Sequence, residues 1–305
     1  MTKWLVTSAS ILQIFGYCGE LTKKYLQQEV ELQQLSEREK EVAIALHREL
    51  LERPLTRSGE DRRNQWELGW NENLKQLQDS GLEALVPRYY GKFPYVRFKE
   101  EFFGANVDTE LRFLRTILLN ELENLLPRFE VGNIVEFGCG TGQNLFFLHD
   151  FFSNINFLGT DWSNQSREII NFAKKKFSVK NVAALPTFDY FKPNYDFSLG
   201  SNVGVMTVAS LEQVGSDFGK FLDYLMFVKP DFVLHIEPEA DLLNADNPFD
   251  QSSIRYMRKR GYLNGLLNDL KSREQLGEIE ILTAKRSYMG SFPMDGYSVM
   301  AWTPR

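Results

Sequence analysis

The pattern of apolar and polar residues divides the chain into two unlike parts. Residues 20–80 are rich in Glu, Gln, Lys and Arg, and their leucines recur at roughly helical spacing with no strand-like run. A capping box at Ser36–Glu39 predicts one helix start, and a second helix is predicted over residues 65–78. A further amphipathic helix is expected over residues 107–126. We therefore expect residues 1–128 to form an α-helical N-terminal region.

Residues 129–305 instead alternate short apolar runs with helix-like segments, an order that is typical of a parallel sheet covered by helices. The last two runs flank a turn-rich stretch, which predicts an antiparallel hairpin. In chain order, the strand-like runs are residues 133–137, 155–161, 181–190, 195–202, 231–238, 278–284 and 297–302.

A glycine-rich loop follows the first of these runs. Glu136 precedes Gly138, Gly140 and Gly142 in the pattern E-x-G-x-G-x-G. Glycine allows a backbone to approach a ligand where any Cβ would clash, and a strand that leads through such a loop into a helix forms a nucleotide-binding crevice. The spacing differs from the dinucleotide fingerprint, and no Lys-Ser/Thr pair follows, so a P-loop is also excluded.

The second strand-like run ends in Asp161, which lies about 20 residues beyond the glycine loop, where doubly wound sheets place an acidic residue that binds both ribose hydroxyls. Simple capping of the following helix is the alternative role for Asp161.

These motifs and the C-terminal hairpin resemble those of class I S-adenosylmethionine-dependent methyltransferases, over roughly residues 129–305. The resemblance implies a Rossmann-like, seven-stranded, mostly parallel sheet with an antiparallel C-terminal strand. It also implies an enzyme that binds S-adenosyl-L-methionine and releases S-adenosyl-L-homocysteine. Phe188 would lie against the adenine ring and Asp189 near its amino group, although a core Phe and a loop Asp explain them equally well. The expected cofactor-binding residues are Glu136, Gly138, Gly140, Gly142, Asn144, Asp161, Trp162, Phe188, Asp189 and Asn202.

Methyl transfer from a sulfonium is a direct displacement, so the enzyme's main task is to hold the two reactants in line. An alcohol acceptor also needs a base. His235 and Glu237 alternate on the fifth strand-like run and therefore point to the same side of the sheet. We expect Glu237 to face the pocket. His235 has the unperturbed pKa of a base near neutrality, but a core histidine is the alternative.

Two segments are candidates for acceptor binding. Aromatic and basic residues alternate over residues 87–98, so Tyr89, Tyr90 and Tyr95 are expected to form a lid or substrate wall. Arg255 and Tyr256 are expected to receive an acidic or phosphorylated substrate, unless they lie on a solvated helix face.

The acceptor is expected to be a small molecule or glycan methylated on oxygen, in secondary metabolite or polysaccharide biosynthesis. The alternatives are a protein or RNA methyltransferase and a non-catalytic S-adenosylmethionine-binding module.

Composition narrows the choice of partners. The formal net charge is −6, which argues against a general nucleic-acid surface. Two cysteines do not make a disulfide framework, and three histidines lack metal-ligand spacing. The chain has no run of about 20 apolar residues, so no membrane span is predicted. A cytoplasmic protein is expected. The N-terminal helices are candidates for a homodimer contact.

Overall fold

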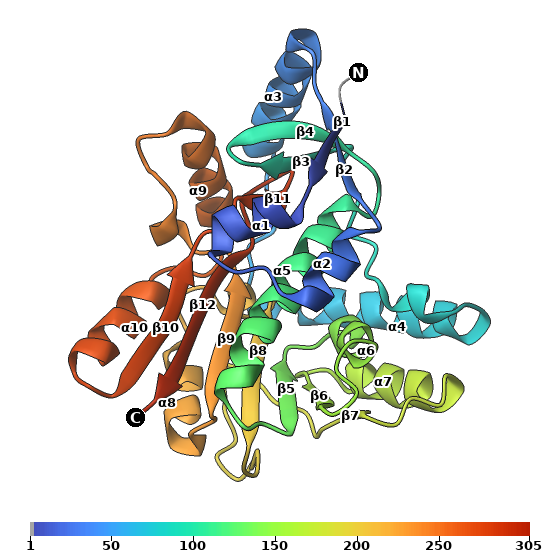
Figure 1. The fold of residues 1–305 in the computed structure, drawn as a ribbon, viewed down its shortest axis with the longest axis vertical. Helices are drawn as coiled ribbons and strands as arrows, with labels where there is room; N and C mark the ends of the chain where they lie inside the picture. Colours follow the sequence, from blue (N-terminus) through green and yellow to red (C-terminus); the bar gives the residue numbers. More distant parts are fainter. Residues whose placement is uncertain (1–2) are drawn as a thin grey trace.

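The computed structural model describes residues 3–305, which form two β-sheets and the helices around them (Figure 1). The larger sheet has seven strands in the order β10-β12-β9-β8-β5-β6-β7, and the smaller sheet has five in the order β1-β2-β4-β3-β11. In the view of Figure 1, the small sheet lies above the large one.

The large sheet confirms the predicted Rossmann-like architecture. Five adjacent strands, β9-β8-β5-β6-β7, run parallel to one another. The C-terminal strand, β12, runs antiparallel between β9 and β10. The strands are β5 (Asn133–Phe137), β6 (Asn156–Thr160), β7 (Val182–Ala184), β8 (Val203–Val208), β9 (Phe232–Glu237), β10 (Ile279–Lys285) and β12 (Ser298–Pro304).

Helices cover both faces of this sheet, which explains why its central strands are apolar almost throughout. Alternate residues face opposite layers: Ile134 of β5 belongs to one hydrophobic cluster and Val135 to the other. The first cluster contains side chains of α5 (Thr109–Leu125), α6 (Gln143–His149) and α7 (Asn164–Lys176). The second contains those of α8 (Gly219–Val228) and α10 (Leu266–Gln275).

The prediction of a fourth strand over residues 195–202 is wrong, because the strand, β8, begins at Val203. The earlier segment is irregular, yet Phe197 is buried against Phe137 and Phe188. Its apolar residues pack on the core as a loop and imitate a strand. The carboxyl end of the fourth strand is therefore Val208, and the residues after it reach the edge where ligands bind in this fold.

The N-terminal region contains the three predicted helices, α3 (Glu37–Glu52), α4 (Arg63–Asp79) and α5. Two more helices, α1 (Ser8–Phe15) and α2 (Glu20–Leu26), precede them. The capping box at the start of α3 is present, since the Ser36 hydroxyl accepts from the Glu39 amide and the Glu39 carboxylate accepts from the Ser36 amide.

The same region also contributes four short strands, so it is not purely helical. They are β1 (Lys3–Val6), β2 (Val30–Gln34), β3 (Tyr95–Phe98) and β4 (Glu101–Ala105). The small sheet is completed by β11 (Met289–Ser291), which pairs antiparallel with β3. Strands of three to five residues are too short for alternation to be recognised in sequence. The small sheet thus joins the two parts of the chain across the expected boundary at residue 128.

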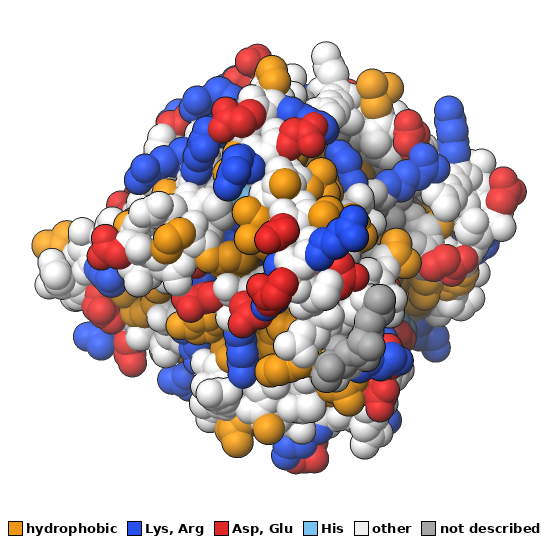
Figure 2. Space-filling view, turned by 90° about the horizontal axis from the view of Figure 1, so that it is seen from above, with side chains coloured by type: hydrophobic (Ala, Val, Ile, Leu, Met, Phe, Trp, Pro, Cys, Tyr) orange, Lys and Arg blue, Asp and Glu red, His pale blue; other side chains and the backbone are white. Residues whose placement is uncertain are grey.

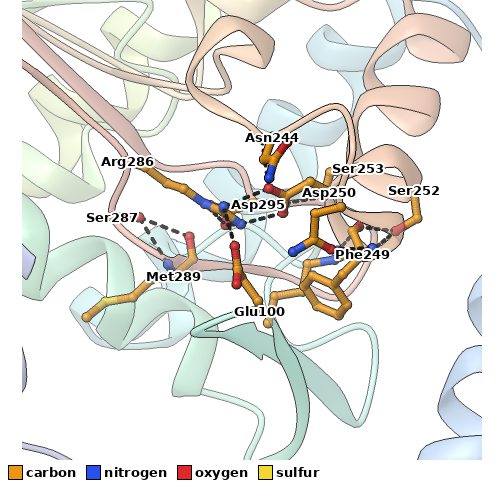
Figure 3. Close-up of polar contacts among 12 residues, drawn as sticks. Glu100, Asn244, Phe249, Asp250, Ser252, Ser253, Arg286, Ser287, Met289 and Asp295 are labelled. Atoms are coloured by element: carbon orange, nitrogen blue, oxygen red, sulfur yellow. Dashed lines mark hydrogen bonds and ion pairs between the residues drawn. The ribbon is translucent and has the colours of Figure 1, made fainter.

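A buried cluster of charged side chains holds these parts together (Figure 3). The Arg286 guanidinium, just after β10, donates to both carboxylate oxygens of Asp250, at 2.8 and 2.6 Å. It also donates to Asp295, at 2.8 Å, and to Glu100 in the turn between β3 and β4, at 3.1 Å. Asp250 lies on α9 (Pro248–Arg260) and is fully buried. One guanidinium therefore connects α9, the C-terminal hairpin and the small sheet.

Replacing Arg286 by Met is expected to lower the free energy of unfolding by about 3–5 kcal/mol, because the buried Asp250 and Asp295 carboxylates lose their counter-ion. Urea denaturation at neutral pH measures this change. Arg273→Met is the matched control, since Arg273 binds Asp223 and Asp269 near the surface, where ion pairs contribute about 1 kcal/mol or less. Equal effects of the two substitutions would contradict this view of the cluster.

Candidate functional site

A cleft with an empty volume of about 890 Å³ lies at the carboxyl edge of the large sheet. The loops after β5, β6, β7 and β8 form its floor. Its roof comes from the N-terminal region, through Trp66 and Trp70 of α4 and through Tyr89 and Tyr90. The site is therefore built from both parts of the chain.

The glycine loop after β5 needs its glycines for two physical reasons. Gly138 and Gly140 have φ values of +67° and +53°, which side chains disfavour. A Cβ at Gly140 would lie 3.0 Å from the Trp70 ring, and one at Gly138 would lie 2.6 Å from the Ser210 Cβ. Gly142 differs from these two, since a Cβ there would meet Ile170 at 2.7 Å in the core. The loop thus brings backbone, and not side chains, to the cleft.

Four buried polar atoms around this loop have no hydrogen-bond partner within the described part of the chain. Three are acceptors, namely Glu136 Oε2, Gln143 Oε1 and Asn144 Oδ1, and the fourth is the donor Trp70 Nε1. All four residues line the cleft. The second Glu136 oxygen accepts from Asn144 Nδ2 at 2.7 Å. Buried polar groups are nearly always paired in folded proteins, so this set calls for a ligand that both donates and accepts hydrogen bonds.

Burial changes the acidity of the two carboxyl groups at the loop. It raises the pKa of Glu136 to about 8, against the opposing hydrogen bond from Asn144. It raises the pKa of Asp161 to about 6, although the amides of Ser163 and Gly140 donate to this carboxylate, each at 3.0 Å. A ligand that brings a cation or hydroxyl groups to these two carboxyl groups would stabilise their ionised forms.

The outer rim of the cleft carries Trp162 and Asp189, as the sequence predicted for residues after the second and third strands. Arg63 of α4 forms an ion pair with Asp189 and lies 5.2 Å from the centre of the Trp162 ring. The N-terminal region therefore contacts the floor of the cleft directly at this rim.

A second and larger cavity, with an empty volume of about 1790 Å³, shares Trp66, Trp70, Tyr89, Tyr90 and Ala209 with the first. The two cavities are therefore adjacent. Aromatic and charged side chains line the rest of the second cavity. Among them are Arg62, Glu110, Glu212, Tyr256, Arg260, Tyr262 and Tyr297.

Two carboxyl groups in the second cavity have raised pKa values. Burial, reinforced by the charge of Glu237, raises the pKa of Glu212 to about 8. Glu212 follows β8 and accepts from Gln213 Nε2 at 2.7 Å. Burial also raises the pKa of Glu110 to about 7, and the Tyr297 hydroxyl donates to it at 3.0 Å. A buried carboxyl group with a pKa near neutrality is suited to accept or donate a proton.

The expectation that His235 is a catalytic base is wrong. The ring is completely buried, its Nδ1 lies 2.9 Å from the Thr207 hydroxyl, and its Nε2 accepts from Trp302 Nε1 at 3.1 Å. Burial lowers the pKa of His235 to about 3. With both nitrogens occupied in the core, His235 is the structural histidine that the sequence left as the alternative.

The expectation that Glu237 faces the pocket is also wrong. Its carboxylate is fully buried and accepts from the amides of Ser210, Leu211 and Glu212 at 3.0–3.1 Å. These amides begin the short helix η4 (Leu211–Val214). Glu237 therefore acts as a positioning residue, which holds the segment carrying Glu212.

Two cofactor residues expected from the sequence lie elsewhere. Phe188 is buried among Phe137, Phe197 and Tyr224, so it belongs to the core behind the cleft. Asn202 precedes β8, and its carbonyl accepts from the amides of Gly132 and Asn133 at the opposite edge of the sheet. The misplaced fourth strand explains the error for Asn202.

Two substrate residues expected from the sequence also lie elsewhere. Tyr95 is on β3 and packs against Phe292. Arg255 is exposed on α9 and pairs with Glu52 at 2.8 Å. Tyr89, Tyr90 and Tyr256, in contrast, line the second cavity.

Sequence reasoning missed Glu212, Arg62, Arg63 and the roof tryptophans. Glu212 could have been found if the fourth strand had been placed correctly, because it stands four residues after the end of β8. Nothing in the sequence marked Trp66 and Trp70, which look like ordinary apolar positions of an amphipathic helix.

No protein-family model matches the chain, and no curated protein matches it either. Among solved structures, it is similar to a SAM-dependent methyltransferase from Aquifex aeolicus, at 15% identity and a TM-score of 0.41, covering 59% of this chain and 88% of that one. It is also similar to magnesium protoporphyrin IX methyltransferase (ChlM) from Synechocystis, at 12% identity and a TM-score of 0.46, covering 65% and 87%. A third similar structure is the 4+2 cyclase SpnF, at 12% identity and a TM-score of 0.49, covering 82% of this chain and 97% of that one.

These likenesses concern the fold alone. The strand order of the large sheet itself defines the class: a Rossmann-like, seven-stranded sheet with a reversed C-terminal strand, as the resemblance to class I methyltransferases implied. Among residues 3–305, no helix is both long and apolar enough to cross a bilayer. Within the same residues, no group of His, Cys, Asp and Glu side chains is arranged to hold a metal ion.

The raised pKa of Glu136 predicts a pH-dependent effect of Glu136→Gln on stability. The folded state keeps this proton up to about pH 8, whereas a solvent-exposed glutamate loses it near pH 4.5. Wild-type stability therefore falls as the pH rises from 4.5 to 8, and the glutamine variant lacks this loss. Denaturation over that range should show the free energy of unfolding of the variant increasing, relative to that of the wild type, by on the order of a few kcal/mol. A difference that does not change with pH would contradict this prediction.

Proposed function

We propose that the protein transfers a methyl group from S-adenosylmethionine to an oxygen atom of a small-molecule or glycan acceptor. The observation that carries this proposal is the set of unpaired polar atoms around the glycine loop, beside a second, aromatic cavity. The cleft accounts for the methyl donor, and the adjacent second cavity has room for an acceptor next to it.

The unpaired atoms fit the amino-acid end of S-adenosylmethionine. The acceptors of Glu136, Gln143 and Asn144 suit its ammonium group, and the Trp70 Nε1 donor suits its carboxylate. We assign the ribose hydroxyls to the Asp161 carboxylate, and Trp162 and Asp189 at the rim are the groups left for the adenine. When bound, the cofactor supplies a methyl group activated by its positive sulfur.

The acceptor occupies the second cavity in this proposal, and Glu212 is its base. The Glu212 carboxylate would take the proton of the acceptor hydroxyl as that oxygen receives the methyl group that the bound cofactor would supply. Glu212 is suited to this role because it is buried, lines the second cavity and has a pKa of about 8. Tyr90, which is buried and lines both cavities, would help to exclude solvent from the reacting groups.

The alternatives receive less support. A protein or nucleic-acid substrate needs an open and, for RNA, basic surface. Most side chains lining the second cavity are buried or half-buried, and on the face drawn in Figure 2 acidic and basic side chains are interspersed. A non-catalytic binding module would have no use for a buried carboxyl group beside the cleft. A cytoplasmic location, a biosynthetic role and a homodimer through the N-terminal helices stay predictions.

The cofactor is tested by calorimetric titration with S-adenosylmethionine and S-adenosylhomocysteine, with NAD as the negative control. Saturable binding of the first two and none of NAD is expected. Glu136→Gln should weaken S-adenosylmethionine about tenfold or more, because a buried charge-assisted hydrogen bond to the ammonium group is lost.

Glu121→Gln is the matched control for this substitution. Glu121 is equally buried and its pKa is also raised by burial, but it lies on α5 outside the cleft. Its replacement should leave the affinity unchanged. Binding of NAD alone, or equal affinity losses in the two variants, would contradict the assignment of the cleft.

Glu212→Gln is expected to leave cofactor affinity unchanged and to lower kcat by about 10²–10⁴-fold, the usual contribution of a general base. Release of S-adenosylhomocysteine is measured over a panel of hydroxylated sugars and metabolites, and then against pH with the best acceptor. The wild-type rate should rise with pH to a plateau above about 8, because only the carboxylate form accepts the proton. The variant should lose this rise.

Glu72→Gln is the control for the pH profile. Glu72 stands at the exposed rim of the same cavity and pairs with Arg88, so its loss should leave the profile unchanged. A wild-type pH profile retained in Glu212→Gln would remove Glu212 from the mechanism.

A further inference from the structure

Two arginines of the second cavity have no acidic partner among residues 3–305. Arg62 donates to the neutral side chains of Gln65 and Gln213, at 3.2 and 3.1 Å. Arg260 donates to the Thr56 carbonyl and to the Tyr262 hydroxyl. Both line the cavity. Two full positive charges thus lie in one partly buried space without a counter-ion.

Burial makes this lack of a counter-ion energetically significant. Arg260 is only 8% exposed, and its Nε has no hydrogen-bond partner in the described part of the chain. Burial, and then the positive charge of Arg260, lowers the pKa of Arg62. Glu212 is the carboxyl group near both, but neither guanidinium donates to it, and its carboxyl accepts from Gln213 Nε2 instead. Buried charges are normally paired, so the pair requires an anion.

Other arginines near this cavity do not share this property. Arg88, at the rim, pairs with Glu72 at 3.3 Å. Arg255, one turn and a half before Arg260 on α9, pairs with Glu52 at 2.8 Å. Arg62 and Arg260 differ from these two in lacking an acidic partner among residues 3–305, and they lie in the same cavity as the proposed base.

We propose that the acceptor carries an anionic group, a carboxylate or a phosphate, which binds to the guanidinium groups of Arg62 and Arg260. This inference deepens the proposed function and rests on it, since it takes the second cavity as the acceptor site. Guanidinium groups bind both kinds of anion through paired hydrogen bonds. The rings of Tyr256 and Tyr262, which line the same cavity, offer flat apolar faces to a sugar-sized ring. The predicted substrate class is an acidic or phosphorylated carbohydrate-like alcohol.

The test is a binding titration of the full-length protein with three probes of similar size: glucuronate, glucose 6-phosphate and uncharged glucose. It is carried out with S-adenosylhomocysteine present and at constant ionic strength. Tryptophan fluorescence reports binding, because the Arg62 guanidinium lies 4.8 Å from the centre of the Trp66 ring. One or both anionic probes should bind about tenfold or more tightly than glucose, and comparison of the two anions distinguishes carboxylate from phosphate.

Arg62→Gln and Arg260→Gln should each weaken the preferred anion about tenfold or more. Arg62 provides the safer variant, because Arg260 also holds the Thr56 backbone. Arg255→Gln is the matched control on the same helix and should bind the probes as the wild type does. The affinity for S-adenosylmethionine, measured separately for each variant, shows that the fold is retained.

Two results would overturn the inference. One is wild-type protein that binds glucose as tightly as both anions, and the other is an anion affinity that Arg62→Gln and Arg260→Gln leave unchanged. Failure of the proposed function gives a different pattern, in which the anions bind and depend on both arginines but S-adenosylmethionine does not bind.

Discussion

The binding of the Arg286 guanidinium by buried carboxylates is the interaction on which the rest of the structure depends. It places α9 against the C-terminal hairpin and the turn of the small sheet. Because α9 carries Tyr256 and Arg260, the same interaction determines where one wall of the second cavity lies. A charge cluster of this kind adds little net stability compared with an apolar core, but its loss leaves carboxylates unpaired, which makes the arrangement specific.

The second constraint is the contact between the glycine loop and the N-terminal region. Trp70 approaches Gly140 so closely that no side chain fits between them. The cleft at the edge of the large sheet is thereby covered by α4, and the same tryptophan also lines the neighbouring cavity. The proposed donor and acceptor sites therefore share one wall, which would help to hold two reactants in line.

The sequence predicted residues of the cleft best where local geometry dictates their position. Glu136, Gly138, Gly140 and Asp161 follow directly from strand ends, and the structure places all four at the cleft. Prediction failed where a side chain could point either way. Glu237 ends its strand as expected, but the amides of η4 capture its carboxylate. The fourth strand was predicted too early in the chain, so Asn202 was expected at its carboxyl end. In the structure the residues beyond that end include Glu212 instead.

By itself the sequence determined the order of the large sheet's strands along the chain, the helix starts and the glycine loop, because hydrophobic periodicity, capping and backbone freedom are properties of neighbouring residues. Only the tertiary structure decided that β11 pairs with β3, that Trp70 covers Gly140, and that Arg62 lies near Arg260. These contacts join residues far apart in the chain. They follow from how the elements pack, and no local pattern in the sequence encodes that packing.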